Sequence, residues 1–472
     1  MRWDTTVQER PKAESKAPAL ALRLLWTPPG SSGQLHPLRA GVFPVGRAVG
    51  QEGLALPSDP RVSRQHAELR VAGGQAVLVD ASSTGTFVNG QRLGGSCALQ
   101  SGDLIRVGDS FLVFRAEPEL QGQTERHGLV GDSPALGAVR HTLGLVGPTA
   151  ATVLILGETG TGKEVAARAL HLASERMGPL VAVNCSAISE SLAESQLFGH
   201  SAGAFTGARA AARGFLRSAE GGTLFLDEVG ELPGTLQPKL LRALEERSVV
   251  PVGESQPVPF DARVVAATNR NLIEQVSVGA FRADLYARLG EFTLEMPTLR
   301  ERREDILPIL LDALGARPAE LDPELVNALL LHAWPFNVRE LRKVATQLAV
   351  RAQGAPRWGL ELFEPHLRQT AAQTGAGQPG ALHTSAPPAP RAELKVPGGE
   401  GAPRGPAARA DAAEDEPGDD RSLPIPDRAQ LDALLRRWRG VIADVARETG
   451  RSRKQVYRWI EEHQLDVTSY RQ

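Results

Sequence analysis

The stretch VLILGETGTGKE, from Val153 to Glu164, decides the fold of the largest part of this chain. Its first four residues form an apolar run that predicts a buried strand. A glycine-rich turn follows, and a helix is expected to begin at Lys163. The turn matches the phosphate-loop pattern G-x-x-x-x-G-K, in which backbone N–H groups and a helix N-terminus bind phosphate oxygens. Because strand, turn, lysine and helix agree, we expect a nucleotide-binding α/β domain rather than a chance glycine-rich turn.

The phosphate contacts are expected to come from this loop and its lysine. In loops of this type the lysine, here Lys163, reaches the β- and γ-phosphates. Glu164 stands where a Ser or Thr hydroxyl usually holds Mg²⁺, so the metal must depend on other groups. The loop residues predicted to bind nucleotide are Gly157, Glu158, Thr159, Gly160, Thr161, Gly162, Lys163 and Glu164.

The composition limits the possible classes of protein. The chain has 472 residues, which corresponds to about three domains. Its net charge of −2 implies no affinity of the whole chain for polyanions or membranes. The two cysteines, Cys97 and Cys185, cannot form a disulfide framework and fit a reducing compartment. We find no signal peptide and no run of ~20 apolar residues, and therefore expect a cytoplasmic protein without a membrane partner.

The chain divides into segments of different character, which predicts a multidomain protein. Short apolar runs with glycine-rich turns predict an all-β sandwich, and strands alternating with helices predict an α/β core. Expected core strands are Val153–Leu156, Leu180–Asn184, Thr223–Asp227 and Arg263–Thr268; expected lid helices are Arg303–Leu314, Pro323–His332 and Asn337–Val350. The predicted segments are a disordered N-terminus (1–18), the sandwich (19–117), a linker (118–128), the α/β core (129–298), a helical lid (299–370), a disordered Ala/Pro/Gly-rich linker (371–424) and an all-α helix-turn-helix (425–472).

Three short motifs occur in order within the sandwich: Gly46-Arg47, then SRQH from Ser63 to His66, then GTFVNG from Gly85 to Gly90. This order resembles forkhead-associated (FHA) domains, which bind phosphothreonine peptides. A dianionic phosphate is well matched by arginine and hydroxyl donors. The resemblance implies that Arg47, Ser63 and Arg64 hold the phosphate, supported by Ser83 and Thr84, while His66 braces the loop. The alternative is a sandwich that has lost peptide binding and serves only as a contact surface.

The strand Thr223–Asp227 is apolar and ends in two acids, Asp227 and Glu228. Beside a phosphate loop, such a strand places Asp227 at the Mg²⁺ ion and Glu228 at the attacking water. With a glutamate at position 164, more of the metal binding is expected to depend on Asp227.

The sequence GAFTGA, from Gly203 to Ala208, is intact. Together with GETGTGKE it resembles the AAA+ domain of bacterial enhancer-binding proteins, the activators of sigma-54 RNA polymerase, in which a glutamate at the position of Glu164 is usual. The resemblance implies ATP and Mg²⁺ as cofactors and a homo-oligomeric ring, expected to be a hexamer.

Individual roles follow from the same resemblance. Asn184 corresponds to the switch asparagine that contacts Glu228. Arg282 and Arg288 correspond to arginine fingers given to the neighbouring subunit; the alternative is surface ion pairing, for example with Asp284. The remaining assignments are Thr268 and Asn269 as sensor I, Arg339 as sensor II on the lid, and Val130 and Gly131 beside the adenine pocket.

The GAFTGA segment combines mobile glycines with one apolar aromatic side chain, Phe205. An exposed aromatic group at a loop tip usually marks a partner contact, and the resemblance implies region I of sigma-54 as that partner. A buried phenylalanine in an ordinary surface loop is the alternative. The expected contact residues are Gly203, Ala204, Phe205, Thr206, Gly207 and Ala208.

Residues 425–472 resemble the Fis-type helix-turn-helix of this family, with Ser452–His463 as the helix for the major groove of double-stranded DNA. A solvated basic face on a small helical bundle is the alternative. The expected DNA contacts are Arg451, Arg453, Lys454, Gln455, Tyr457 and Arg458.

These segments together predict a sigma-54-dependent transcriptional activator. It would bind upstream DNA, use ATP hydrolysis to remodel sigma-54 RNA polymerase into the open complex, and respond to a phosphothreonine-containing protein or a Ser/Thr kinase through the FHA domain. Two alternatives remain: a phosphopeptide-binding scaffold whose nucleotide site does not hydrolyse ATP, and a DNA-binding repressor that does not contact sigma-54.

Overall fold

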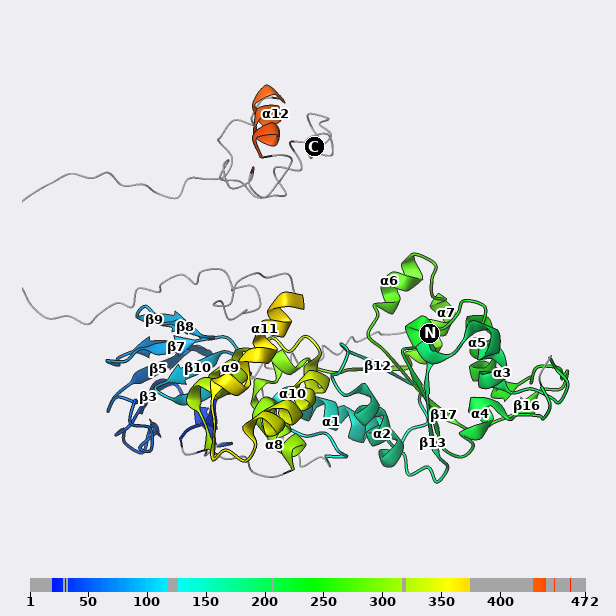
Figure 1. Cartoon of the computed structure of the whole chain (residues 1–472), viewed down its shortest axis with the longest axis horizontal. Helices are drawn as coiled ribbons and strands as arrows, with labels where there is room; N and C mark the ends of the chain where they lie inside the picture. The colour runs from blue at the N-terminus through cyan, green and yellow to red at the C-terminus, as the bar shows by residue number, and fades with distance from the viewer. Residues whose placement is uncertain are drawn as a thin grey trace, which may run out of the picture. The chain divides into compact units, whose positions relative to one another are not determined.

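The computed structural model describes residues 19–28, 30, 33–116, 126–205, 208–315, 320–373 and 428–438, together with residues 445 and 459. The chain forms two units, Met1–Val396 and Pro397–Gln472 (Figure 1). The second unit contains one described helix, α12 (Arg428–Arg437). None of the helices in the described part of the chain is long and apolar enough to cross a bilayer.

The first segment of the larger unit is a sandwich of two β-sheets, as the turn-rich pattern predicts. One sheet has the order β2-β1-β11-β10-β7-β8 and the other β4-β3-β5-β6-β9. Strand β1 pairs antiparallel with β11, and β5 with β6. The strands are β1 (Leu20–Trp26), β2 (Leu35–Leu38), β3 (Gly41–Gly46), β4 (Leu54–Ala55), β5 (Ala67–Ala72), β6 (Gln75–Asp80), β7 (Thr86–Val88), β8 (Gln91–Arg92), β9 (Ser96–Ala98), β10 (Leu104–Val107) and β11 (Ser110–Ala116).

The α/β core contains a five-stranded parallel sheet of order β13-β14-β17-β12-β18. Its strands are β12 (Val153–Leu156), β13 (Leu180–Asn184), β14 (Thr223–Asp227), β17 (Arg263–Thr268) and β18 (Phe292–Glu295), so the four expected strands have the expected bounds. Successive residues of a strand point to opposite faces of the sheet and so enter different apolar clusters. Leu154 and Leu224 lie in one cluster, and Ile155 and Phe225 lie in the other. Burial on both faces explains the continuous apolar runs in the sequence.

Helices and short elements surround this sheet. They are α1 (Pro134–Val146), α2 (Lys163–Ala173), η1 (Cys185–Ala187), α3 (Glu190–Phe198), α4 (Gly214–Ser218), η2 (Val229–Glu231), α5 (Gln237–Glu246), β15 (Ser248–Val249), β16 (Val258–Pro259), α6 (Leu272–Ser277) and α7 (Ala283–Leu289). Because all five strands are parallel, the loops after β12, β14 and β17 meet at one edge of the sheet.

The lid follows as a small helical bundle. Its elements are η3 (Leu299–Glu301), η4 (Arg303–Asp305), α8 (Ile306–Leu314), β19 (Glu320–Leu321), α9 (Pro323–Leu331), α10 (Asn337–Ala352), β20 (Arg357–Trp358), η5 (Leu360–Leu362) and α11 (Glu364–Gln373). The expected helix from Arg303 begins instead as the 3-10 turn η4, and its α-helical part starts at Ile306. Helix α11 extends three residues beyond the predicted lid boundary at residue 370.

Candidate functional site

A pocket of about 400 Å³ lies where the edge of the parallel sheet meets the lid. The phosphate loop and both acids after β14 line it from the core, and α8 and α10 line it from the lid. Its lining comprises Gly128, Leu129, Val130, Thr159, Gly160, Thr161, Gly162, Lys163, Glu164, Val165, Asp227, Glu228, Arg302, Ile309, Val338, Arg339 and Arg342.

The phosphate loop needs glycine at its tip because the lid is so close. Gly160 has φ +79°, and a Cβ there would lie 2.2 Å from the carbonyl oxygen of Phe336. The lid also bonds to this residue, since Val338 N donates to Gly160 O at 3.0 Å. Phe336 itself has φ −109° and is 52% exposed, so its side chain fits without strain at the start of α10.

Lys163 lies at the start of α2 with its ammonium group inside the site. Its Nζ donates to Gly157 O at 3.0 Å and lies 3.7 Å from Glu228 Oε1. The side chain is 8% exposed, so little water competes with these contacts. The ammonium group is therefore positioned for a phosphate at the tip of the loop.

The paired acids after β14 concentrate negative charge beside that ammonium group. Burial raises the pKa of the Asp227 carboxyl, and the neighbouring Glu228 raises it further, while Lys163 lowers it. Glu228 adopts the left-handed backbone conformation at φ +51°, which is uncommon for a residue other than glycine. Two adjacent carboxylates in a phosphate-binding pocket are the oxygen donors that a divalent cation prefers, so the residues present fit Mg²⁺.

The residues after β17 connect the Glu228 carboxylate to the phosphate loop. Asn269 N donates to Glu228 Oε2 at 3.2 Å, and Asn269 Nδ2 donates to Thr159 Oγ1 at 2.9 Å. Thr268 is buried and accepts a hydrogen bond from Arg270 N. The structure therefore brings Asn269 of the predicted sensor I into contact with both Glu228 and the phosphate loop.

No hydrogen bond joins Asn184 to Glu228 among the described residues, so the expected contact between them stays a prediction. Asn184 ends β13 and pairs in register with Asp227, but its Oδ1 accepts hydrogen bonds from Ser186 N at 2.9 Å and Ser186 Oγ at 2.7 Å. The reason is local: an asparagine before a helical turn caps it, and here the turn is η1.

The arginines assigned from the resemblance lie in different places. Arg339 lines the pocket from α10. Arg282 and Arg288 flank or lie on α7 and, within the described residues, neither lines the pocket. Arg282 Nη2 bonds Asp284 at 2.7 Å, and Arg288 pairs with Glu291. The two arginines thus make the surface pairs of the alternative interpretation within this single chain.

The two residues predicted to lie beside the adenine pocket, Val130 and Gly131, have different surroundings. Val130 lines the pocket, whereas Gly131 lies against Asp305, where a Cβ would come within 2.2 Å of the carboxyl carbon. Glu158 faces the lid, and its carboxylate accepts hydrogen bonds from Arg300 at 2.9 Å and Asn337 at 3.1 Å. The bond from Arg300 holds the pKa of Glu158 below its usual range.

Sequence reasoning missed four lid residues of the pocket, Arg302, Ile309, Val338 and Arg342. Ile309 and Val338 belong to apolar helical stripes, and such stripes predict residues of the hydrophobic core rather than of a pocket. Arg302 lies in the charged run LRERRED, in which the sequence does not distinguish the arginine that faces the pocket.

Four residues of the GAFTGA segment are described, Gly203, Ala204, Phe205 and Ala208, whereas Thr206 and Gly207 lie outside the described residues. Gly203 N donates to Ala208 O at 2.7 Å, and Ala208 N donates to Phe205 O at 2.9 Å. The Phe205 ring is 37% exposed and packs edge-on against His200 at 5.0 Å. Phe205 is therefore neither fully buried nor free of contacts with its own domain.

The predicted phosphate-binding residues gather at one edge of the sandwich. Ser63 Oγ lies 3.3 Å from Ser83 Oγ, and Ser63 O accepts a hydrogen bond from Arg47 N. Arg47 and Arg64 are both exposed. Fully buried His66 accepts from Ser63 N through Nδ1, and burial lowers its pKa. This edge presents hydroxyls and guanidinium groups on a rigid base, the chemistry that binds a phosphate ester.

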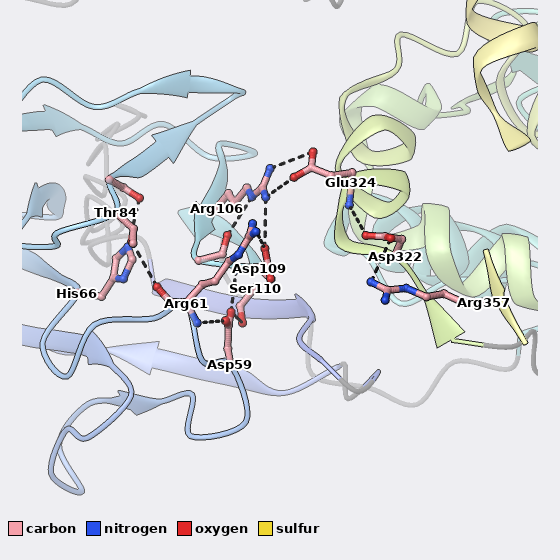
Figure 2. A network of polar contacts seen from close by, with 12 residues as sticks. Asp59, Arg61, His66, Thr84, Arg106, Asp109, Ser110, Asp322, Glu324 and Arg357 are labelled. Atoms are coloured by element: carbon pink, nitrogen blue, oxygen red, sulfur yellow. Dashed lines mark hydrogen bonds and ion pairs between the residues drawn. The ribbon is translucent and has the colours of Figure 1, made fainter. Parts of the chain in front are cut away.

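A polar network leads from this edge to the lid (Figure 2). Thr84 Oγ1 donates to Arg61 O at 3.3 Å, and Arg61 and Arg106 both pair with Asp109. Arg106 in turn bonds Glu324 of α9 at 2.7 Å (Figure 2). The predicted DNA-contacting residues Arg451, Arg453, Lys454, Gln455, Tyr457 and Arg458 lie outside the described residues.

The fold and the site define the class. A parallel sheet carries a phosphate loop after β12, paired acids after β14 and polar sensors after β17, and a helical lid closes the pocket. This is an ATPase of the AAA+ P-loop class.

Comparison with known families agrees with this class. Residues 129–295 match the family model of the sigma-54 interaction domain, residues 300–379 that of an AAA+ ATPase lid domain, and residues 44–108 that of the FHA domain. The chain therefore carries a sigma-54 interaction domain and an AAA+ lid domain together with an FHA domain.

The similar proteins include transcriptional regulatory protein ZraR of Klebsiella oxytoca, 48% identical over 245 residues that cover 50% of this chain and 55% of ZraR. The sigma-54-dependent transcriptional activator SfnR of Pseudomonas putida is 47% identical over 242 residues, which cover 50% of this chain and 66% of SfnR. Among solved structures, NtrX from Brucella abortus in complex with ADP is 27% identical with a TM-score of 0.47, covering 72% of this chain and 69% of NtrX. The chain spans about half the length of the curated relatives it matches.

Proposed function

We propose that this chain activates transcription by coupling ATP hydrolysis to the remodelling of sigma-54 RNA polymerase into the open complex. The observation that carries the proposal is the GAFTGA loop, which presents the partly exposed Phe205 on the same domain as the nucleotide pocket. The sensor contacts between Asn269, Glu228 and Thr159 support it, because they connect the acid to the phosphate loop.

The hydrolytic chemistry would depend on three side chains of the pocket. Lys163 would neutralise charge on the terminal phosphates, and Glu228 would orient and deprotonate the attacking water. Asp227 would hold Mg²⁺, which when bound neutralises charge on the β- and γ-phosphates. Asn269 N, which donates to Glu228 Oε2, would hold that carboxylate in place.

Arg282 and Arg288 would complete the site of a neighbouring subunit. In the single chain their guanidinium groups bond only to acids and a carbonyl of their own domain among the contacts described, and Arg282 lies at the surface. Surface ion pairs of this kind are weak and exchange readily for a new partner. Hydrolysis would then require assembly, which we propose to be a hexameric ring.

The two remaining segments would decide when and where the ring acts. The FHA edge formed by Ser63, Arg64, Ser83 and Arg47 would bind a phosphothreonine, presented by a protein partner or by a Ser/Thr kinase. Residues 425–472 would bind an upstream double-stranded DNA site in the cytoplasm.

The test is open-complex formation on a sigma-54 promoter with ATP. Phe205→Ala should hydrolyse ATP at the wild-type rate and form no open complex, because the ring is intact but the contact is lost. Glu228→Gln should lower hydrolysis by about 10²- to 10⁴-fold while nucleotide still binds. Met177→Ala removes an apolar side chain that is 98% exposed on the same domain, and should leave both activities unchanged. Normal open complexes with Phe205→Ala would contradict the proposal.

The alternatives give different results in the same preparation. A phosphopeptide-binding scaffold would show no ATP hydrolysis at any protein concentration, whereas a ring with shared arginines would show hydrolysis that rises with concentration. A repressor would hydrolyse ATP or bind DNA without producing an open complex.

A further inference from the structure

Four consecutive lid residues, Arg302–Asp305, together bond three different parts of the chain. Arg302 faces the phosphate loop: its Nη2 donates to Thr161 O at 2.8 Å, and the residue is 2% exposed. Thr161 is part of the loop that lines the nucleotide pocket. Arg302 is therefore a direct support of the phosphate-binding backbone.

The next two residues face the FHA domain. Arg303 Nη1 donates to Asn89 Oδ1 at 2.8 Å and to Gly102 O at 3.4 Å. Glu304 accepts a hydrogen bond from Arg115 Nε at 2.8 Å, in an ion pair whose side chains are 8% and 1% exposed. Asn89, Gly102 and Arg115 all belong to the sandwich.

The fourth residue, Asp305, holds the adenine side of the pocket. Its Oδ1 accepts hydrogen bonds from Asp132 N at 2.8 Å and Ser133 N at 2.9 Å, and its Oδ2 accepts from Ser133 Oγ at 2.6 Å. Asp305 is fully buried, and Gly131 packs directly against its carboxyl group. These backbone groups follow Leu129 and Val130, which line the pocket.

The sandwich contacts the lid over an apolar surface as well as through these polar bonds. The outward-facing residues of β1, β10 and β11 share one core cluster with lid residues that include Leu325 and Leu329. The sandwich members of that cluster are Leu25, Trp26, Leu104, Phe111 and Val113. At the rim, Arg106 bonds Glu324 (Figure 2). The FHA domain is therefore docked on the lid through a buried interface.

We propose that Arg302 and Asp305 are positioning residues for the nucleotide pocket, and that the docked FHA domain holds them in place through Arg303 and Glu304. Arg303–Asp305 form the 3-10 turn η4, in which consecutive side chains point about 120° apart, and Arg302 directly precedes this turn. One short turn can thus bond the phosphate loop, the FHA domain and the adenine side together. A shift of Arg303 or Glu304 cannot leave Arg302 and Asp305 unmoved.

The consequence is that nucleotide affinity depends on FHA docking. Coupling between two sites through such an element typically changes affinity by about 5- to 150-fold. The phosphate-binding edge of the sandwich reaches the same interface through Arg61, Asp109 and Arg106 (Figure 2). The inference rests on nucleotide binding, but on neither the polymerase contact nor phosphopeptide recognition.

The first test is calorimetric titration of the full chain with ADP. Arg303→Met keeps the apolar stem but removes the bonds to Asn89 and Gly102, and should weaken ADP binding at least about 5-fold. The matched control is Arg368→Met, which removes a surface pair with Glu364 in which the arginine is 73% exposed, and should bind ADP with wild-type affinity. Wild-type ADP affinity in a folded Arg303→Met protein would overturn the proposal.

The second test uses the buried ion pair. Arg115→Leu leaves the Glu304 carboxylate buried without its partner and should weaken ADP binding, whereas Arg115→Leu/Glu304→Leu replaces the pair by apolar groups and should restore it. Arg115→Leu should also raise the KM for ATP but keep kcat, because Lys163, Asp227 and Glu228 are unchanged. A double variant as weak as the single one would contradict the coupling. Since ADP binding needs no polymerase, that outcome would leave the proposed remodelling activity standing.

Discussion

Glu340 of α10 is the buried acid whose removal has the most predictable consequence. Its Oε1 accepts hydrogen bonds from His332 Nε2 at 3.1 Å and His366 Nε2 at 2.8 Å, and its Oε2 accepts one from Phe336 N at 3.0 Å. Burial alone would raise the pKa of this carboxyl, but the bonds from both histidines and the backbone outweigh burial and lower the pKa to about 2, from 4.5.

The size of the effect follows from this shift. A difference of about 2.5 pKa units corresponds to roughly 3 kcal/mol of stabilisation of the folded lid. Because the folded pKa lies below the unfolded one, this stabilisation is fully present above about pH 4.5 and is lost as the pH falls towards 2. Glu340→Gln should therefore cost roughly 3 kcal/mol at pH 7 and should show none of this acid dependence.

Hydrogen exchange of the α10 amides, followed by mass spectrometry, measures this local stability. At pH 7 the amides of Glu340→Gln should exchange about 100-fold faster than those of the wild type. ADP binding should weaken too, because Val338 and Arg339, next to Glu340, donate backbone hydrogen bonds to Gly160 O.

The matched control is Glu364→Gln on α11, which removes an acid that is 45% exposed in its pair with Arg368. Its effect should stay within about 0.5 kcal/mol. Equal exchange rates for wild type and Glu340→Gln, or the same loss of stability below pH 4.5 in both, would refute the reasoning.

Three further predictions concern the other sites. Lys163→Ala and Arg288→Ala should each hydrolyse no ATP alone, but a mixture should recover ATPase activity, since an intact arginine can then meet an intact phosphate loop; no recovery would exclude a finger in trans. Arg47→Ala should abolish binding of a phosphothreonine peptide in calorimetry and leave basal ATPase activity unchanged, and equal peptide affinity would disprove its role. Gly131→Ala should weaken ADP binding, because its φ is +121° and a Cβ would lie 2.2 Å from a carboxyl carbon, whereas Gly137→Ala, with nothing within 4 Å, should not.

Four of the five core strands could be predicted to the residue because of how they are buried, whereas β18 (Phe292–Glu295), exposed at three of its four positions, was not predicted. The strand Val153–Leu156 and the central residues 264–267 of β17 lie between helical layers, so both of their faces are apolar. The phosphate loop could be predicted equally well, because a close backbone contact with the lid requires glycine at position 160.

The orientation of individual polar side chains was not predictable in the same way. Asn184 can satisfy its side chain either across the sheet edge or in its own turn, and the local bond to Ser186 is the one formed. In the run LRERRED, three arginines have the same chemistry, yet Arg300 bonds Glu158, Arg302 bonds Thr161 O and Arg303 bonds Asn89. These directions depend on two short 3-10 turns and on the domain packed against them.

Strand β11 shows why the sequence predicted the FHA domain but not its docking on the lid. A strand with one solvated face should alternate apolar and polar residues, but FLVF from Phe111 to Phe114 is continuously apolar and fully buried. Leu112 and Phe114 enter the sandwich core, whereas Phe111 and Val113 enter the cluster shared with the lid. The apolar run therefore indicates a covered outer face, and the buried ion pair of Arg115 with Glu304 identifies the lid as its cover. A domain held on the lid through both an apolar face and a buried charge pair is constrained in position as well as attached.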